Sequence, residues 1–140
     1  RSTHRGTLFP YTTLFRSVEE FVRWASPVLQ FARFATEDVE IAGQRINAGD
    51  KIGMFYCSAN RDASVFPDAG TFDLSRSPNP HLGFGGGGPH FCLGNRLAKT
   101  ELRNLFRELL TRLDTVEFGE PDLLYSNFVH GIKRLPAHIR

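Results

Sequence analysis

The stretch that most constrains this chain is residues 84–94, Phe-Gly-Gly-Gly-Gly-Pro-His-Phe-Cys-Leu-Gly. Four consecutive glycines bury no side chain and lose much conformational entropy on ordering, so they suit a place where backbone must pass close to another group. Residues 95–110 follow at once, with apolar residues at three- and four-residue steps that predict a helix. Cys92 is therefore expected at, or one residue before, a helix N-terminus, where unpaired N–H groups and the helix dipole favour a thiolate.

A cysteine in such a loop can be a nucleophile, a zinc ligand, a haem ligand or an inert thiol. Cys57 and Cys92 are the only two cysteines of the 140 residues, which does not make a disulfide framework and favours a reducing compartment. No closely spaced Cys or His pair of the zinc type occurs, and no Gly-Lys-Ser/Thr follows the glycines as in nucleotide-binding loops. Cys57 ends an apolar run and is expected to be a buried core thiol.

Residues 84–94 closely resemble the haem-binding loop of bacterial-type cytochromes P450. The family pattern of an aromatic residue, glycines, a basic residue two before the cysteine and a glycine two after it falls on Phe84, Gly88, His90, Cys92 and Gly94. One feature departs from the commoner spacing: Phe84 lies eight residues before the cysteine rather than seven. The resemblance implies that Cys92 is the axial thiolate ligand of haem b iron, and so both the metal ligand and the catalytic centre.

The same resemblance assigns roles to residues around the ligand. It implies that Phe84 and Phe91 wall the thiolate off from water and that Gly88 and Gly94 let the backbone approach the sulfur. Arg33 corresponds to a residue that pairs with a haem propionate, and His90 is a second candidate donor, because a buried dianionic cofactor needs cationic hydrogen-bond donors.

Glu20 and Arg23 are three residues apart in a segment, 18–25, that reads as a helix ended by Pro27. Taken alone they are an ordinary surface pair, but upstream of this cysteine loop they resemble the buried Glu/Arg pair of the family. Many members are expected to complete a triad with an arginine at the position of Thr71; in this chain that triad is in doubt, with Arg61 or Arg76 as substitutes.

The remaining pattern predicts a mainly α fold with small β-sheets, an α+β arrangement that resembles the C-terminal part of a cytochrome P450. Extended segments are expected over residues 27–35, 39–41, 44–46 and 51–57, an irregular segment over 63–82, and a C-terminal hairpin with its tip at 127–131. By the resemblance, Val28, Leu29 and Val129 face the substrate. One buried stripe is expected on the helix after the cysteine, made of Ala98, Leu102, Leu105, Phe106, Leu109, Leu110 and Leu113.

The first residues read differently from the rest. Residues 7–17, Thr-Leu-Phe-Pro-Tyr-Thr-Thr-Leu-Phe-Arg-Ser, resemble the translation of a sequencing-adapter oligonucleotide. Residues 1–17 are therefore expected to be non-native, and residues 18–140 to be the C-terminal part of a single cytochrome P450 domain. The alternative is a genuine apolar N-terminal segment carrying Leu8, Phe9, Leu14 and Phe15.

These features together predict part of a haem-thiolate monooxygenase that inserts one oxygen atom from O2 into an apolar substrate such as a steroid, lipid or terpenoid. Electrons are expected from a ferredoxin-type or other redox partner. A non-catalytic haem-thiolate module for electron transfer or sensing is the alternative. A net charge of +2 gives no case for nucleic acid, and no apolar run is long enough to span a membrane. A cytoplasmic monomer is expected, and the 140 residues alone are expected to be inactive.

Overall fold

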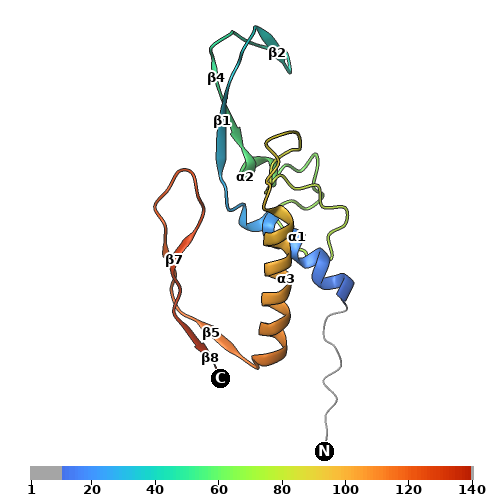
Figure 1. Ribbon diagram of the computed structural model, residues 1–140, viewed down its shortest axis with the longest axis vertical. Helices are drawn as coiled ribbons and strands as arrows, with labels where there is room; N and C mark the ends of the chain where they lie inside the picture. The colour runs from blue at the N-terminus through green and yellow to red at the C-terminus, as the bar shows by residue number, and fades with distance from the viewer. Residues whose placement is uncertain (1–10, 140) are drawn as a thin grey trace, which may run out of the picture.

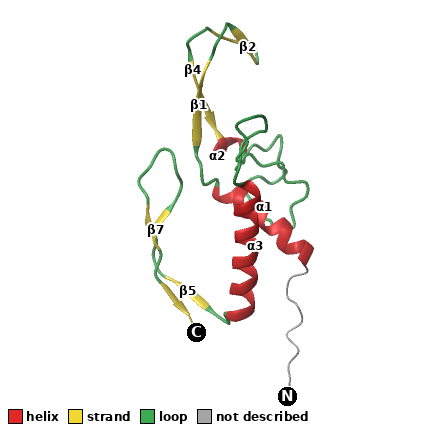
Figure 2. Cartoon of the chain, viewed as in Figure 1, coloured by secondary structure: helices red, strands yellow, loops and turns green. Residues whose placement is uncertain are grey.

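Two helices that pack against each other form the centre of the molecule, and two β-ribbons extend from them (Figure 1, Figure 2). The computed structural model describes residues 11–139. The longer helices are α1, Tyr11–Ala25, and α3, Asn95–Arg112, and a short helix, α2, spans Tyr56–Ala59. The small sheets and helices are an α+β arrangement, as the sequence predicted.

The helix expected over residues 18–25 is confirmed, although α1 begins earlier, at Tyr11. It ends where Ser26 adopts a positive φ of 41° and donates its amide to the Val22 carbonyl at 3.0 Å. The Ser26 hydroxyl also donates to the Arg23 carbonyl at 2.8 Å. This left-handed turn closes the helix one residue before Pro27, which cannot continue it.

The first ribbon is a pair of nested antiparallel hairpins. Its outer strands are β1, Gln30–Phe34, and β4, Lys51–Phe55; its inner strands are β2, Val39–Ile41, and β3, Gln44–Ile46. The predicted strand over 51–57 is two residues too long, because α2 begins at Tyr56. Cys57 therefore lies on α2 and is only half-buried, so its assignment to the core was wrong.

The second ribbon repeats this nesting after α3. Its outer strands are β5, Val116–Phe118, and β8, Ala137–Ile139; its inner strands are β6, Asp122–Leu123, and β7, Ile132–Arg134. The tip of this ribbon returns to the segment after α1, where Val28 and Val129 form an antiparallel bridge. Two segments a hundred residues apart in sequence therefore lie side by side.

Aromatic packing joins α1 to α3. The ring of Phe21 stacks on Phe106 with centroids 4.3 Å apart, and Phe72 lies against both Phe21 and Trp24 at 5.4 and 5.6 Å. The stripe predicted on α3 is not buried as expected: no described residue of α3 is fully buried, and Leu105 is 52% exposed. The periodicity shows an apolar face, but among the described elements α1 is the helix that packs on it, and it covers only part of that face.

A long irregular segment, residues 60–94, joins α2 to α3 and lies against α1 (Figure 2). It packs tightly against the helix at Gly83, where an added Cβ would lie 2.5 Å from Val22 Cγ1 and 3.3 Å from the Val22 carbonyl. Val22 is itself buried. In the part of the chain that the structure describes, no helix has the length and hydropathy needed to cross a membrane.

The Gly83 contact predicts a steric cost. Gly83→Ala should lower the free energy of unfolding by roughly 1–3 kcal/mol, because a buried β-branched neighbour has little freedom to move away. Gly70→Ala is the matched control, since nothing lies within 4 Å of an added Cβ there. Thermal or urea unfolding of the two variants measures the difference; equal stabilities would contradict the packing described.

Candidate functional site

The cysteine loop is fastened at both ends by backbone hydrogen bonds. The Cys92 amide donates to the Phe84 carbonyl at 2.9 Å, and the Cys92 carbonyl accepts from the Asn95 amide at 3.2 Å and from Asn95 Nδ2 at 2.7 Å. Because α3 begins at Asn95 with Gly94 as its N-cap, Cys92 lies three residues before the helix rather than at its first residue. The Cys92 side chain is exposed.

Glycine is required where this loop turns. Gly85 and Gly88 have φ values of 96° and 72°, in the left-handed region that other residues rarely adopt. A Cβ on Gly85 would also lie 3.7 Å from the His90 carbonyl. At the far end of the loop, a Cβ on Gly94 would lie 3.9 Å from Cys92 Sγ. The loop thus folds back on itself with the sulfur close to the backbone that begins α3.

A cavity of about 510 Å³ opens beside the glycines. Arg33 from β1 and His90 from the cysteine loop both line it, so the two predicted cationic donors reach one space although they are far apart in sequence. The other lining residues are Met54, Phe55, Tyr56, Ala59, Leu82, Gly85, Gly86 and Gly87. Its volume falls within the range of roughly 300–1,000 Å³ typical of cofactor sites.

The predicted pair of Glu20 and Arg23 is fully buried. Arg23 donates Nε and one terminal nitrogen to the two carboxylate oxygens of Glu20, each at 2.7 Å. Its remaining donors reach the carbonyls of Asn60, Ala69 and Thr71 at 2.7, 3.0 and 2.9 Å. Every N–H of the guanidinium is used, as a charged group without water requires.

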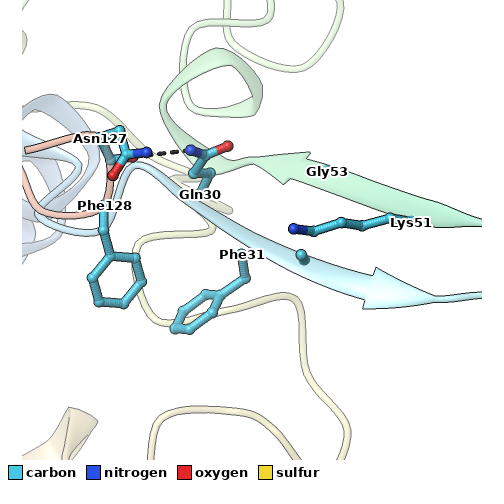
Figure 3. A pocket seen from close by; sticks show the side chains of 7 residues that line it. Gln30, Phe31, Lys51, Gly53, Asn127 and Phe128 are labelled. Carbon is cyan, nitrogen blue, oxygen red and sulfur yellow. Dashed lines mark hydrogen bonds between the residues drawn. The ribbon is translucent and has the colours of Figure 1, made fainter.

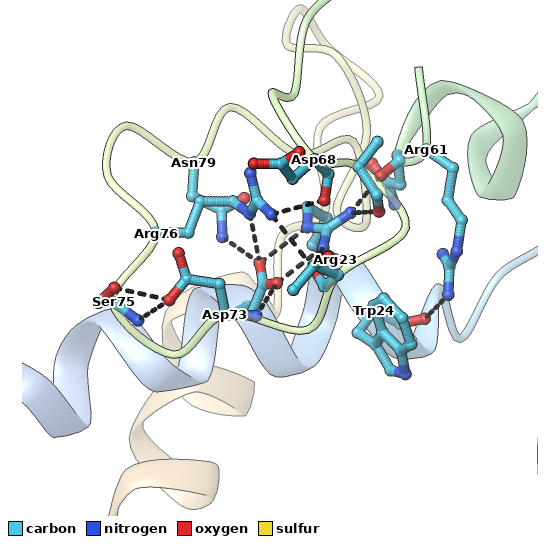
Figure 4. Close-up of polar contacts among 12 residues, drawn as sticks. Arg23, Trp24, Arg61, Asp68, Asp73, Ser75, Arg76 and Asn79 are labelled. Atoms are coloured by element: carbon cyan, nitrogen blue, oxygen red, sulfur yellow. Dashed lines mark hydrogen bonds and ion pairs between the residues drawn. The ribbon is translucent and has the colours of Figure 1, made fainter. Parts of the chain in front are cut away.

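Arg76 supplies the third member of the triad. Its Nε lies 3.3 Å from Glu20 Oε2, and its terminal nitrogens donate to the carbonyls of Pro67, Asp68 and Thr71 (Figure 4). Arg61 instead lies over the Trp24 ring at 4.4 Å. Thr71 takes part in this cluster through its carbonyl, which accepts from Arg23 and Arg76. The missing arginine at position 71 is therefore replaced by Arg76.

Glu20 remains ionised in this cluster. Burial by itself raises its pKa, but the hydrogen bonds from Arg23 and from the Asp73 amide, together with the charges of Arg23 and Arg76, hold the pKa below its usual value. Asn79 Nδ2 donates to the same carboxylate at 3.0 Å. Arg76, the Asp73 amide and Asn79, all in the irregular segment, therefore converge on one carboxylate of α1.

Two buried or partly buried polar groups near the loop were not predicted. Asn60 is fully buried, donates to the Ser26 hydroxyl at 3.0 Å and accepts from the Leu82 amide at 2.7 Å. Glu19 lies 3.0 Å from His81 Nε2 and 2.7 Å from Lys99 Nζ. No local pattern identifies either residue, because all the partners named here lie at least 22 residues away in the sequence and only the tertiary fold brings them close.

The residues predicted to face substrate meet at the second ribbon's tip. Val28 and Val129 are bridged, and the Leu29 amide donates to the Phe128 carbonyl at 2.9 Å. Beside them the rings of Phe31 and Phe128 meet edge to face, 5.3 Å apart, in a cavity of about 450 Å³ (Figure 3). This cavity is distinct from the one at the glycines.

Comparison with known protein families covers the segment that contains these residues. The family model for cytochrome P450 matches residues 8–135. The chain belongs to the cytochrome P450 family. Members of this family hold haem iron through a cysteine thiolate. Among residues 11–139, no three His, Cys, Asp or Glu side chains gather as a metal site of their own.

Several proteins are similar to this cytochrome P450 chain. It is 58% identical over 122 residues to the methyl-branched lipid omega-hydroxylase of Mycobacterium tuberculosis, and 45% identical over 118 residues to the steroid C26-monooxygenase of Mycolicibacterium smegmatis. These alignments cover 86% and 84% of this chain but 28% of each relative. The chain thus spans less than a third of their length.

Solved structures agree with the fold. The cytochrome P450 CYP268A2 of Mycobacterium marinum in complex with pseudoionone has a TM-score of 0.87 and 52% identity, and the match covers 90% of this chain and 30% of that one. This likeness extends over helices and ribbons alike.

The residues present fit haem. The loop offers an exposed cysteine at Cys92. Cys92 does not itself line the cavity described above, but Gly85, Gly86, Gly87 and His90 of the same loop do, with Arg33 as a second cationic donor. A soft thiolate, cationic hydrogen-bond donors and an apolar lining suit an iron porphyrin with acidic side groups.

The buried pair predicts an asymmetric response to mutation. Arg23→Ala should destabilise the protein by roughly 3–5 kcal/mol, because Glu20 is left buried and uncompensated. Arg112→Ala removes an exposed partner of Glu108 on α3 and should cost less than about 1 kcal/mol. Urea unfolding compares the two; similar costs would show that the Glu20 cluster is not the buried brace described here.

Glu19 predicts a pH dependence. Burial raises its pKa, but the hydrogen bonds from His81 and Lys99 and the charge of Lys99 outweigh this and lower the pKa from 4.5 to about 2. Its ionised form then contributes up to roughly 3 kcal/mol of stability above pH 4.5, and this contribution is lost as pH falls toward 2. Glu19→Gln should lower stability at pH 7 and flatten the pH curve in that window, measured by urea unfolding. The exposed carboxylate variant Glu101→Gln should keep the wild-type curve, and a parallel curve for Glu19→Gln would refute the assignment.

Proposed function

We propose that the protein carrying this chain is a haem-thiolate monooxygenase that inserts one oxygen atom from O2 into an apolar substrate. The observation that carries the proposal is the cysteine loop, in which Cys92 follows a glycine turn and donates its amide to Phe84. The glycines of this loop line a cavity together with Arg33 and His90. Haem b, when bound, supplies the oxidising chemistry, and the thiolate favours O–O cleavage.

Each residue of the site has a separate role in this proposal. Cys92 provides the axial sulfur, and Arg33 and His90 hydrogen-bond the acidic side groups of the cofactor. Phe84 and Phe91 keep water from the sulfur, which preserves the strength of the interactions around it. Gly88 and Gly94 leave the backbone free to approach, and Glu20 with Arg23 braces the segment that leads to the loop.

The substrate is a lipid, steroid or terpenoid. The edge of the substrate pocket is formed by Val28, Leu29 and Val129. The Val28–Val129 bridge supports this assignment, as do the paired rings of Phe31 and Phe128 beside it. The similar proteins named as a methyl-branched lipid omega-hydroxylase and a steroid C26-monooxygenase point to the same substrate class. An aromatic and aliphatic lining favours apolar molecules because their burial removes apolar surface from water.

The organisation of the chain is part of the proposal. Residues 18–140 form the C-terminal part of one cytochrome P450 domain, and residues 1–17 are adapter-derived. The family match begins at residue 8 and α1 begins at Tyr11, so both include part of residues 1–17. The proposed boundary at residue 18 rests on the resemblance of residues 7–17 to a translated adapter. The protein works as a cytoplasmic monomer with a ferredoxin-type or other redox partner, and residues 1–140 alone are inactive.

A carbon monoxide difference spectrum tests the proposal. The full-length protein, reconstituted with haem and reduced, should give a Soret band at the position of thiolate-ligated haem. Cys92→Ser should lose this band, because a serine hydroxyl cannot replace the thiolate. Cys57→Ser, the other cysteine, is the matched control and should keep it.

Two outcomes would overturn the proposal. A wild-type spectrum without the thiolate-type band, or one indifferent to Cys92→Ser, would remove the ligand assignment. A thiolate-type band with no oxygenated product from fatty acids, steroids or terpenoids, when electrons and O2 are supplied, would favour the electron-transfer or sensing module instead.

A further inference from the structure

Glu19 lies next to the buried Glu20 but serves a different part of the molecule. Successive residues of a helix point about 100° apart, so the two carboxylates face different neighbours. Glu20 binds the irregular segment through Arg23, Arg76 and Asn79. Glu19 faces the approach to the cysteine loop and α3, where His81, Lys99 and Arg103 lie 3.0, 2.7 and 3.8 Å from its oxygens.

His81 is held in one tautomer by its two contacts. Its Nδ1 accepts the Gly83 amide at 3.1 Å, so the ring proton lies on Nε2 and is donated to Glu19 at 3.0 Å. The side chain is only 4% exposed. The imidazole thereby links the carboxylate on α1 to the backbone just before Phe84.

Phe84 lies beside two of the residues that Glu19 binds. Its ring centroid is 5.9 Å from that of His81 and 5.3 Å from the ammonium of Lys99. A cation over an aromatic face is attracted by the ring quadrupole. The carbonyl of this same Phe84 accepts the Cys92 amide at 2.9 Å. A continuous set of contacts therefore runs from Glu19 to the backbone of the cysteine.

Steric contact reinforces this connection. Gly83 fits against α1 so closely that an added Cβ would lie 2.5 Å from Val22 Cγ1, and the Leu82 amide is bound by the buried side chain of Asn60. The backbone at residues 82 and 83 consequently has little freedom, and the contacts of the Phe84 ring with His81 and Lys99 hold the next residue.

We propose that Glu19 is a positioning residue for the thiolate ligand: through His81 and Lys99 it fixes Phe84, and through the Phe84 carbonyl it fixes the backbone of Cys92. The inference rests on the proposed haem-thiolate function. Residues that orient a metal ligand typically affect metal affinity or activity by 10- to 100-fold when they are changed. The carboxylate itself touches neither the sulfur nor the cofactor cavity as lined above.

The test follows the thiolate signature over time rather than turnover. The full-length holoprotein is reduced under carbon monoxide, and the rate at which the thiolate-type Soret band is lost is measured at a fixed temperature below unfolding. Glu19→Gln, which keeps the shape but removes the charge, should lose the band roughly 10-fold faster than the wild type. Glu101→Gln, on the exposed face of α3, should match the wild type.

A second control separates positioning from general stability. Val18→Ala truncates a fully buried residue of the same helix and should lower the melting temperature without hastening loss of the band below it. Lys99→Met should act through the same contact, so Glu19→Gln combined with Lys99→Met should be no worse than the more damaging single variant.

Each outcome decides the question. Glu19→Gln behaving like Val18→Ala, with lower stability but an unchanged rate of band loss, would overturn the positioning role. Additive effects of Glu19→Gln and Lys99→Met would do the same. A wild-type holoprotein that lacks the thiolate-type band would instead overturn the haem-thiolate function on which the inference rests.

Discussion

The bidentate pair of Glu20 and Arg23 is the interaction on which the rest of the structure depends. The pair lies at zero exposure and joins α1 to residues 60–79, a segment with no regular strands or long helix of its own. Two guanidinium groups share one carboxylate there, so the cluster has an excess positive charge. Backbone carbonyls offset it, with Thr71 accepting from both Arg23 and Arg76. An irregular segment is a suitable partner because its carbonyls are not committed to a sheet or helix.

Polar contacts take a share of the stabilisation that apolar packing usually provides. The described residues include only four buried hydrophobic residues, Val18, Val22, Phe66 and Ala69, while several buried groups are polar or charged. Helix α1 therefore binds its neighbours through two carboxylates: Glu20 contacts the irregular segment, and Glu19 contacts His81 and α3. Such networks are sensitive to the loss of one member, because each unpaired group stays desolvated. The cysteine loop contacts the second of these sets, through the ring of Phe84.

Local sequence patterns predicted most of the elements but little of how they meet. The helix before Pro27, the extended segments after it and the helix after Cys92 follow from periodicity and turn residues, and all are present. The predicted antiparallel meander was wrong in its pairing, because β1 pairs with β4 around the β2–β3 hairpin. The sequence did not decide whether Arg61 or Arg76 joins Arg23 at Glu20. Both lie tens of residues away, and only tertiary packing brings Arg76 close. The prediction that the apolar stripe on α3 is buried was wrong for a related reason. Periodicity indicates that a helix has an apolar face, but it does not indicate what covers that face.

The turn at Ser26 shows how one backbone feature places two distant sites. Its positive φ ends α1 and redirects the chain into an extended segment at Pro27, whose carbonyl accepts the His130 amide at 2.9 Å. The His130 ring donates Nδ1–H to the Ala25 carbonyl at 2.8 Å, which fixes the second ribbon at the same point. From there β1 carries Phe31 to the aromatic cavity and Arg33 to the cavity beside the glycines. Phe31 and Arg33 are two residues apart and so lie on the same face of β1, because side chains alternate along a strand. They nevertheless line different cavities: the returning C-terminal tip closes the cavity at Phe31, and the cysteine loop closes the one at Arg33. The separation of the aromatic cavity from the cavity beside the glycines is thus set by where α1 stops.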